Sequence, residues 1–428
     1  MQAWMDAASL GLRAQSFLGL VAFVALAWLF SENRRRFPLR AAAWTVIAQI
    51  IFAAFMLYTP GARDALAFLN IAVEALQQAT EAGTSLVFGH LGGGPAPFTV
   101  ANDAAMFSLA FRGLPLLIFF SGLAALLWHI GLLKLFVKGL ALILSRGFGV
   151  GGAVALAAAA NTFLGQTEAP LLIRAFLSKL SRSELFIVIT GGFATIAGSV
   201  MVLYAALLEP IQPSILGHII LASLLSAPAG VLMAIIMMPP EESEEPTAAN
   251  AGDDFTYDSA MDAFTSGVAD GLKLYLNILA ALIAFTALAA LINILLSAAP
   301  PIDGAPLTLQ HLLGWLFAPL MWLAGVPWGE AVTAGSLMGV KTALNELLAY
   351  IDLTKLPEGA LSERSQLIVI YALCGFANFA SLGIVVSGLK AIAPDRRDDV
   401  LALGPKALVA GTLATLMTGA VIGLVWAG

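Results

Sequence analysis

The chain has 428 residues, of which 60% are hydrophobic and only 11% are charged, and its mean hydropathy is +0.90. This number of polar residues is too small to cover the surface of a soluble globular protein of this size. The composition therefore predicts an all-α polytopic membrane protein. The formal net charge of -6 says little, because acidic residues contribute weakly to membrane topology. The sequence shows no footprint of nucleic-acid binding, and a single cysteine, Cys374, excludes an intramolecular disulfide.

Eight segments are apolar enough to be membrane-spanning helices, which need roughly 20 residues each. They cover about 15–32, 40–59, 113–136, 185–208, 214–238, 268–297, 364–390 and 401–427. A mixed region at about 60–110 suits a helix lying at the interface, and the Leu-rich segment 307–323 is expected to be a second, outer interfacial helix. Short basic loops after the first, third and seventh spans belong in the cytoplasm, so both termini are predicted to lie outside.

Two further apolar segments, about 149–180 and about 328–352, do not fit as spans. The first is bounded by cytoplasmic charges on both sides, whereas the second lies between segments that the count places outside. Each is interrupted near its middle, one by Gly165 and Pro170 and the other by the polar run from Lys341 to Glu346. Arms of about 12 residues reach only about 18 Å, around half the membrane. The sequence therefore predicts two re-entrant hairpins that enter from opposite faces.

An internal repeat supports this arrangement. A Gly-Phe-Ala core at Gly192 recurs 183 residues later at Gly375, each time within a similar span and after a hairpin that carries a glutamate. Because the hairpins enter from opposite faces, the repeats are predicted to be inverted, as in many secondary transporters. The expected organisation is a scaffold of spans and an interfacial helix (1–112), a first repeat (113–239), an acidic cytoplasmic linker (240–262) and a second repeat (263–428).

Four polar clusters fall at membrane depth. They are Asn161 with Gln166, Thr167 and Glu168; Thr190 with Thr195 and Ser199; Asn345 with Glu346; and Asn378 with Ser381. A lone Ser or Thr in a membrane helix usually bonds to a neighbouring helix, and this structural role is favoured for Thr190 or Ser199 alone. Glu168 and Glu346 have no basic residue three or four positions away, so a functional role is favoured for both.

The glycine-rich stretch 190–199 favours local unwinding of a span, which would expose carbonyl groups to a cation. Close helix packing explains the glycines nearly as well. However, Asn161 and Thr195 together with freed carbonyls offer an all-oxygen set, which suits a hard and preferably monovalent cation. These features predict a secondary transporter that moves an organic solute by alternating access.

Two other classes of protein are alternatives to a transporter. An intramembrane enzyme is not supported, because the chain contains no His-Glu-x-x-His, Gly-x-Ser-x-Gly or Gly-x-Gly-Asp motif. A gated channel, or a binding protein without accumulation, stays open as the alternative from another class.

Several motifs in the same order resemble those of the concentrative nucleoside transporter family, in its shorter bacterial form with eight spans. They are Gly165-Gln166-Thr167-Glu168-Ala169-Pro170, Ala194-Thr195-Ile196-Ala197-Gly198-Ser199-Val200, Gly314-Trp315-Leu316-Phe317-Ala318-Pro319, Gly325-Val326-Pro327-Trp328, Lys341-Thr342-Ala343-Leu344-Asn345-Glu346 and Ala372-Leu373-Cys374-Gly375-Phe376-Ala377-Asn378-Phe379. The similarity extends from about Leu18 to the C-terminus. It implies a nucleoside substrate such as uridine, a homotrimer in the bacterial inner (plasma) membrane, no organic cofactor and no enzymatic activity.

The resemblance also implies roles for individual residues. Gln166, Thr167 and Glu168 would address the nucleobase, with Val200 nearby; Glu346, Asn378 and Ser381 would hold the ribose hydroxyls, and Phe376 would pack on the ligand. A sodium site would use Asn161 and Thr195, with carbonyls of Thr190, Gly191 and Ile196. Thr195 departs from the Ser that the sodium-coupled pattern has there, yet it keeps the hydroxyl. Na+ is therefore the expected coupling ion, H+ is the alternative, and a carrier of free nucleobases is a further one.

Overall fold

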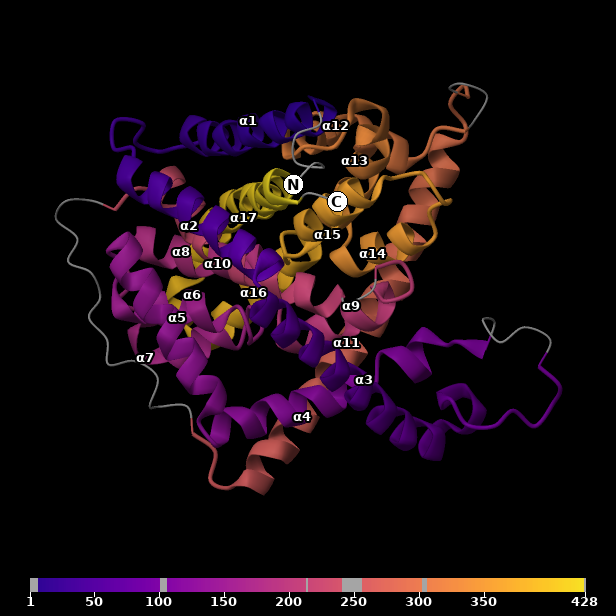
Figure 1. Cartoon of the computed structure of the whole chain (residues 1–428). Coiled ribbons are helices and arrows are strands. Elements are labelled where there is room, and N and C mark those ends of the chain that lie inside the picture. The colour runs from indigo at the N-terminus through magenta and orange to yellow at the C-terminus, as the bar shows by residue number, and fades with distance from the viewer. Residues whose placement is uncertain (1–6, 101–105, 213–214, 241–255, 302–305, 427–428) are drawn as a thin grey trace.

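A computed structural model of the chain describes residues 7–100, 106–212, 215–240, 256–301 and 306–426, and all regular structure in these ranges is helical (Figure 1). This agrees with the all-α prediction. The predicted linker, 240–262, falls largely on 241–255, outside the described residues.

The N-terminal part contains two apolar helices, a long third helix and a helix pair. The elements are α1 (Ala7–Leu29), α2 (Leu39–Tyr58), α3 (Pro60–Phe88), η2 (Gly89–Gly92), η4 (Leu109–Gly113), α4 (Leu116–His129) and α5 (Leu132–Phe148). The predicted third span, 113–136, extended too far, because α4 ends at His129 and a new helix begins at Leu132. Gly131 lies between them with a φ of 88°, a left-handed conformation that glycine adopts without steric cost and that turns the chain.

The first expected repeat follows as α6 (Gly152–Ala160), η5 (Ala169–Ile173), α7 (Arg174–Leu177), α8 (Arg182–Ala194), α9 (Gly198–Leu208) and α10 (Ile215–Met237). Helix α8 begins with a reciprocal cap: the backbone N–H of Glu184 donates to Ser181 Oγ, and the backbone N–H of Ser181 donates to Glu184 Oε2, each at 3.1 Å. This cap satisfies two of the N–H groups that a helix leaves free at its start, and so fixes where α8 begins.

The second part contains α11 (Ala260–Leu296), α12 (Leu309–Ala324), α13 (Trp328–Ala343), α14 (Glu346–Thr354), α15 (Glu363–Leu373), α16 (Phe379–Ile392), η6 (Pro394–Arg396) and α17 (Arg397–Val425). Its order matches that of the first part: a pair of short helices joined by a turn, a helix interrupted near its middle, and a long helix. The interruption divides α8 from α9 at Thr195–Ala197 and α15 from α16 at Cys374–Asn378.

Among the described residues, seven helical segments are long and apolar enough to cross a membrane, or up to eight if the pair α12 and α13, bent by 117°, counts as one. Each of the seven overlaps one of the eight predicted spans. The remaining predicted span, 364–390, is divided into α15 and α16.

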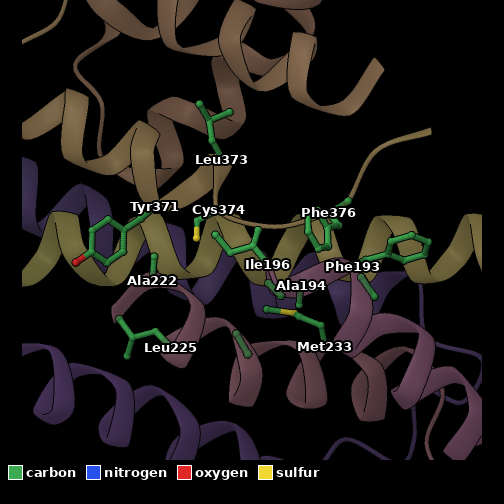
Figure 2. Packing of buried hydrophobic residues seen from close by; sticks show 14 of the residues in the cluster. Phe193, Ala194, Ile196, Ala222, Leu225, Met233, Tyr371, Leu373, Cys374 and Phe376 are labelled. Atoms are coloured by element: carbon green, nitrogen blue, oxygen red, sulfur yellow. The ribbon is translucent and has the colours of Figure 1, made fainter. Parts of the chain in front are cut away.

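The two interrupted helices meet in the centre of the molecule. Figure 2 shows Phe193 and Ala194 at the end of α8, and Ile196 of the first interruption, near Cys374 and Phe376 of the second. The backbone N–H of Phe376 donates to the carbonyl of Thr195 at 3.2 Å. Helices α10 and α17 are buried over most of their length around this meeting point, whereas few residues in the apolar part of α11 are fully buried. The backbone N–H and C=O groups left free where the two helices are interrupted are thus enclosed by protein.

Gly375 allows this close approach. A Cβ atom at this position would lie 2.9 Å from the carbonyl oxygens of both Phe193 and Ala194, and 2.6 Å from the Thr415 side chain. We predict that Gly375→Ala lowers the free energy of unfolding by about 1–3 kcal/mol, since backbone must move to admit the methyl group. Thermal unfolding of the purified protein in detergent measures this. Gly383→Ala is the matched control, because a Cβ there meets nothing within 4 Å; equal losses in the two variants would contradict the steric argument.

Candidate functional site

A cavity of about 450 Å³ lies where the two helix interruptions and the two short helix pairs converge. Its walls come from the turn before η5, the N-terminal parts of α9, α14 and α16, and one face of α11. The predicted residues on its lining are Gln166, Thr167, Glu168, Val200, Glu346, Phe376, Asn378 and Ser381. All the residues that the sequence analysis assigned to an organic ligand therefore line one cavity, although they are far apart in the chain.

Glu346 is the centre of one side of the cavity. It is only 5% exposed, and its two carboxylate oxygens accept separate hydrogen bonds, from Tyr204 Oη at 2.5 Å and from Asn378 Nδ2 at 2.7 Å. Asn378 in turn caps α16, because its Oδ1 accepts from the backbone N–H of Ser381 at 2.7 Å. This chain of bonds fixes the carboxylate and the amide in one orientation and presents acceptor atoms to the cavity.

The turn between α6 and η5 forms the other polar side. Glu168 Oε2 accepts from the backbone N–H of Gly165 at 2.9 Å, which folds the turn over its own side chain. Gln166 is 8% exposed, and its Oε1 is buried without a hydrogen-bond partner. A buried amide oxygen without a partner is costly, so this atom is available to a ligand donor.

A separate cluster of oxygen atoms lies behind this turn, away from the cavity lining. Thr195 Oγ1 is 2.9 Å from the carbonyl oxygens of both Asn161 and Gly191. The Asn161 side chain is 2% exposed and lies against the glycines of α8, since a Cβ at Gly191 would be 3.4 Å from its Nδ2. Both amide atoms of Asn161 and the hydroxyl of Thr190 are buried without a hydrogen-bond partner.

The chemistry of this cluster fits a small cation. Its atoms are neutral oxygen ligands from a side-chain amide, hydroxyls and carbonyls near the C-terminal end of α8, where the helix dipole is negative. The structure thus brings Asn161, Gly191 and Thr195 together, and Thr190 directly precedes Gly191 on α8. Ile196 lies in the adjoining interruption and is fully buried.

Sequence reasoning missed four polar residues that line the cavity. Tyr204 follows Val200 by one helical turn on α9, a spacing that places both on one face and could have identified it. The others, Asp270, Lys273 and Asn277, form a polar stripe on α11 at spacings of three and four, and Lys273 Nζ donates to Asp270 Oδ1 at 3.0 Å. The sequence analysis gave 268–297 only as an apolar span and singled out none of its polar residues.

A cavity with polar groups on its walls, inside a bundle of long apolar helices, is typical of an integral membrane protein with a solute site. Comparison with known proteins makes the class narrower. Three family profiles match the chain in order: Na+ dependent nucleoside transporter N-terminus over residues 18–91, Nucleoside recognition (gate) over 110–211, and Na+ dependent nucleoside transporter C-terminus over 218–423.

Individual proteins are similar over nearly the whole chain. An uncharacterized transporter of Haemophilus influenzae is 40% identical over 96% of this chain and 97% of its own length. The nucleoside permease NupC of Helicobacter pylori is 34% identical over 96% of this chain and 97% of its own. The solved structure of CNTnw in an inward-facing substrate-bound state has a TM-score of 0.87 and 38% identity, covering 97% of this chain and 98% of that one. The chain belongs to the concentrative, Na+ dependent nucleoside transporter family, as its motifs indicated.

The bond between Tyr204 and Glu346 generates a prediction about stability. A charge-assisted hydrogen bond between buried groups contributes about 1.5–3 kcal/mol. We therefore expect Tyr204→Phe and Glu346→Gln each to lower the unfolding temperature, and the double variant to lose less than the sum of the two. A double-mutant cycle of thermal unfolding in detergent measures this coupling. Strictly additive losses would show that the two side chains do not interact.

Proposed function

We propose that the protein is a Na+-coupled symporter that imports nucleosides such as uridine by alternating access. The observation that carries the proposal is the pairing of two sites around one turn: the cavity, lined by acceptors and donors on opposite sides, and the oxygen cluster behind Gln166, Thr167 and Glu168. One is suited to an uncharged polar solute and the other to a monovalent cation.

Gln166, Thr167 and Glu168 are assigned to the nucleobase. An amide and a hydroxyl can both donate and accept, and the exocyclic groups and ring nitrogens of a base require both. Val200 and Phe376 supply apolar surface beside them, since both line the cavity and are 3% and 9% exposed. Planar bases gain from such contacts.

Glu346, Asn378 and Ser381 are assigned to the ribose. The sugar hydroxyls are donors, and a carboxylate held by Tyr204 and Asn378 offers them a charged acceptor. A free nucleobase lacks these hydroxyls and would leave the carboxylate without its ligand. The density of polar groups at this end therefore favours a nucleoside over a free base.

Asn161 and Thr195, with the carbonyls of Thr190, Gly191 and Ile196, are assigned to Na+. Buried polar atoms without partners in the side chains of Asn161 and Thr190 support the assignment. Neutral ligands of this kind give no group that would carry a proton, so Na+ is favoured over H+. A cation here would stabilise the same turn that presents Gln166 to the cavity, which makes solute and ion affinities reciprocally linked.

We further propose that α6–α7 and α13–α14 are opposed re-entrant hairpins of an inverted repeat, and that eight spans cross the membrane with both termini outside. The hairpins and interrupted helices would move as a unit against a scaffold that includes α11. A homotrimer in the bacterial inner membrane is the expected assembly, in keeping with the family.

Uptake into proteoliposomes tests the function and its coupling. With an inward Na+ gradient we expect labelled uridine to rise above its external concentration, because a gradient drives accumulation only in a carrier. The same assay with an imposed proton gradient and no Na+ tests the H+ alternative. Uptake that only equilibrates would favour a gated channel, indifference to both gradients would exclude coupling, and competition by uracil as strong as that by other ribosides would favour a nucleobase carrier.

Glu346→Gln tests the ribose assignment. Replacing a charged acceptor by a neutral one removes about 1.5–3 kcal/mol of interaction, so uridine affinity should fall roughly ten- to hundredfold. Isothermal titration of purified protein in Na+ measures the change, and uracil binding should be affected much less. Glu358→Gln, on an exposed loop of the same region, is the control. Unchanged uridine affinity in Glu346→Gln would make the ribose assignment wrong.

A further inference from the structure

Lys341 is a buried charge that the proposed transport mechanism does not use. It lies near the end of α13, its side chain is fully inaccessible, and it is among the largest of the completely buried side chains. Its Nζ donates to Thr415 Oγ1 at 3.1 Å and to the carbonyl of Ala372 at 3.4 Å. An ammonium at membrane depth is expensive, so it requires a specific compensating environment.

When the sequences of the two repeats are aligned, Lys341 falls at the position of Asn161. The first turn contains Asn161-Thr162-Phe163-Leu164 and ends at Glu168; the second contains Lys341-Thr342-Ala343-Leu344 and ends at Glu346. The first copy is longer by two residues before its glutamate, Gly165 and Gln166. With the glutamates and the Thr-x-Leu patterns aligned, the lysine takes the position of the asparagine assigned to the cation.

The partner atoms lie at comparable helix ends, although in a different register. Lys341 contacts the C-terminal end of α15, and Asn161 lies against its counterpart α8 near the C-terminal end. With Gly192 aligned to Gly375, Ala372 corresponds to Ile189 rather than to Gly191. The last carbonyls of α15 all have donors: Ile370 accepts from Tyr350 Oη at 2.9 Å, Tyr371 from the N–H of Cys374 at 3.2 Å, and Leu373 from the N–H of Gly375 at 2.8 Å. The fourth, Ala372, accepts from the ammonium. A positive charge is favourable at this negative end of the helix dipole.

The first repeat lacks such a charge. At the end of α8 the corresponding side chain is neutral, and the amide of Asn161 and the hydroxyls of Thr162 and Thr190 are buried without hydrogen-bond partners. The two repeats therefore satisfy the free carbonyl groups at the end of the interrupted helix in different ways. The second interrupted helix ends on a cation attached to the chain, and the first ends on oxygen atoms that suit a cation from solution.

We propose that Lys341 is a built-in counterpart of the coupling cation, a positioning residue whose ammonium occupies the second repeat's cation position. The inference deepens the proposed function and rests on it. The ammonium holds the end of α15, from which the chain continues through Phe376 to Asn378, so the charge positions ligand-binding groups without touching the solute.

Two variants separate this role from simple packing. Lys341→Asn restores the residue of the first repeat and should create a second cation site together with Ala372 O and Thr415 Oγ1, whereas Lys341→Met keeps similar length without a ligand atom. For Lys341→Asn we expect Na+ activation of uridine uptake to steepen, with the Hill coefficient rising from about 1 towards about 2. For Lys341→Met we expect uptake to fall about tenfold or more, with unchanged steepness.

A second readout does not require transport. The melting temperature of each purified variant is measured in NaCl and in choline chloride. Lys341→Asn should gain more stabilisation from Na+ than the wild type does, and Lys341→Met should not. The proposal would be overturned if both variants had the same Hill coefficient for Na+ activation and the same stabilisation by Na+. It would also be overturned if both variants had equally lowered melting temperatures in NaCl and in choline chloride. Either result would make Lys341 a packing residue. A wild-type protein without Na+-driven uptake would instead remove the proposed function itself.

Discussion

Two helices are interrupted where they meet inside this molecule, and the remaining structure must satisfy the backbone groups that the interruptions leave free. In a membrane interior no water is available for this purpose, so an interrupted helix is stable only where protein encloses it. Here each interruption serves the other, because the N–H of Phe376 donates to the carbonyl of Thr195 and Gly375 brings the two backbones into contact. The buried helices α10 and α17 enclose the pair and exclude lipid from it.

The same constraint explains why binding groups gather at this place. A helix that begins in the middle of a bundle needs caps, and Asn378 supplies one to α16 while also holding Glu346. A helix that ends there needs donors or a cation for its carbonyls, and Thr195, Tyr350 and Lys341 meet that need in different ways. Polar side chains that the backbone requires are therefore already present where a solute can use them.

Much of this arrangement was predictable from the residue pattern, and the misses have physical causes. Glu168 and Glu346 stood out because a carboxylate is rare in an apolar segment, and the repeat around Gly192 and Gly375 indicated matching interruptions. The end of α4 was misplaced because Gly131 sits between two apolar stretches, and hydropathy alone does not register a left-handed turn. Tyr204 was missed because a tyrosine in a membrane helix is unremarkable by composition. Its position one turn after Val200 is a weak signal, and its 2.5 Å contact with Glu346 shows its role.

The geometry of one turn explains how two ligands could act on each other. Asn161 and Gln166 belong to the same short connection, which is fastened to α9 by the bond from the N–H of Gly198 to the carbonyl of Phe163 at 2.8 Å. Gln166 packs closely on α8, since a Cβ at Gly192 would lie 3.0 Å from Gln166 Cβ. Because the turn is in close contact with both α8 and α9, we expect a shift at the oxygen cluster to move the cavity wall as well. The opposite wall, α11, belongs to a different part of the chain and has its own polar stripe. The turn and α11 both line the cavity, so under the proposed mechanism their separation would open it.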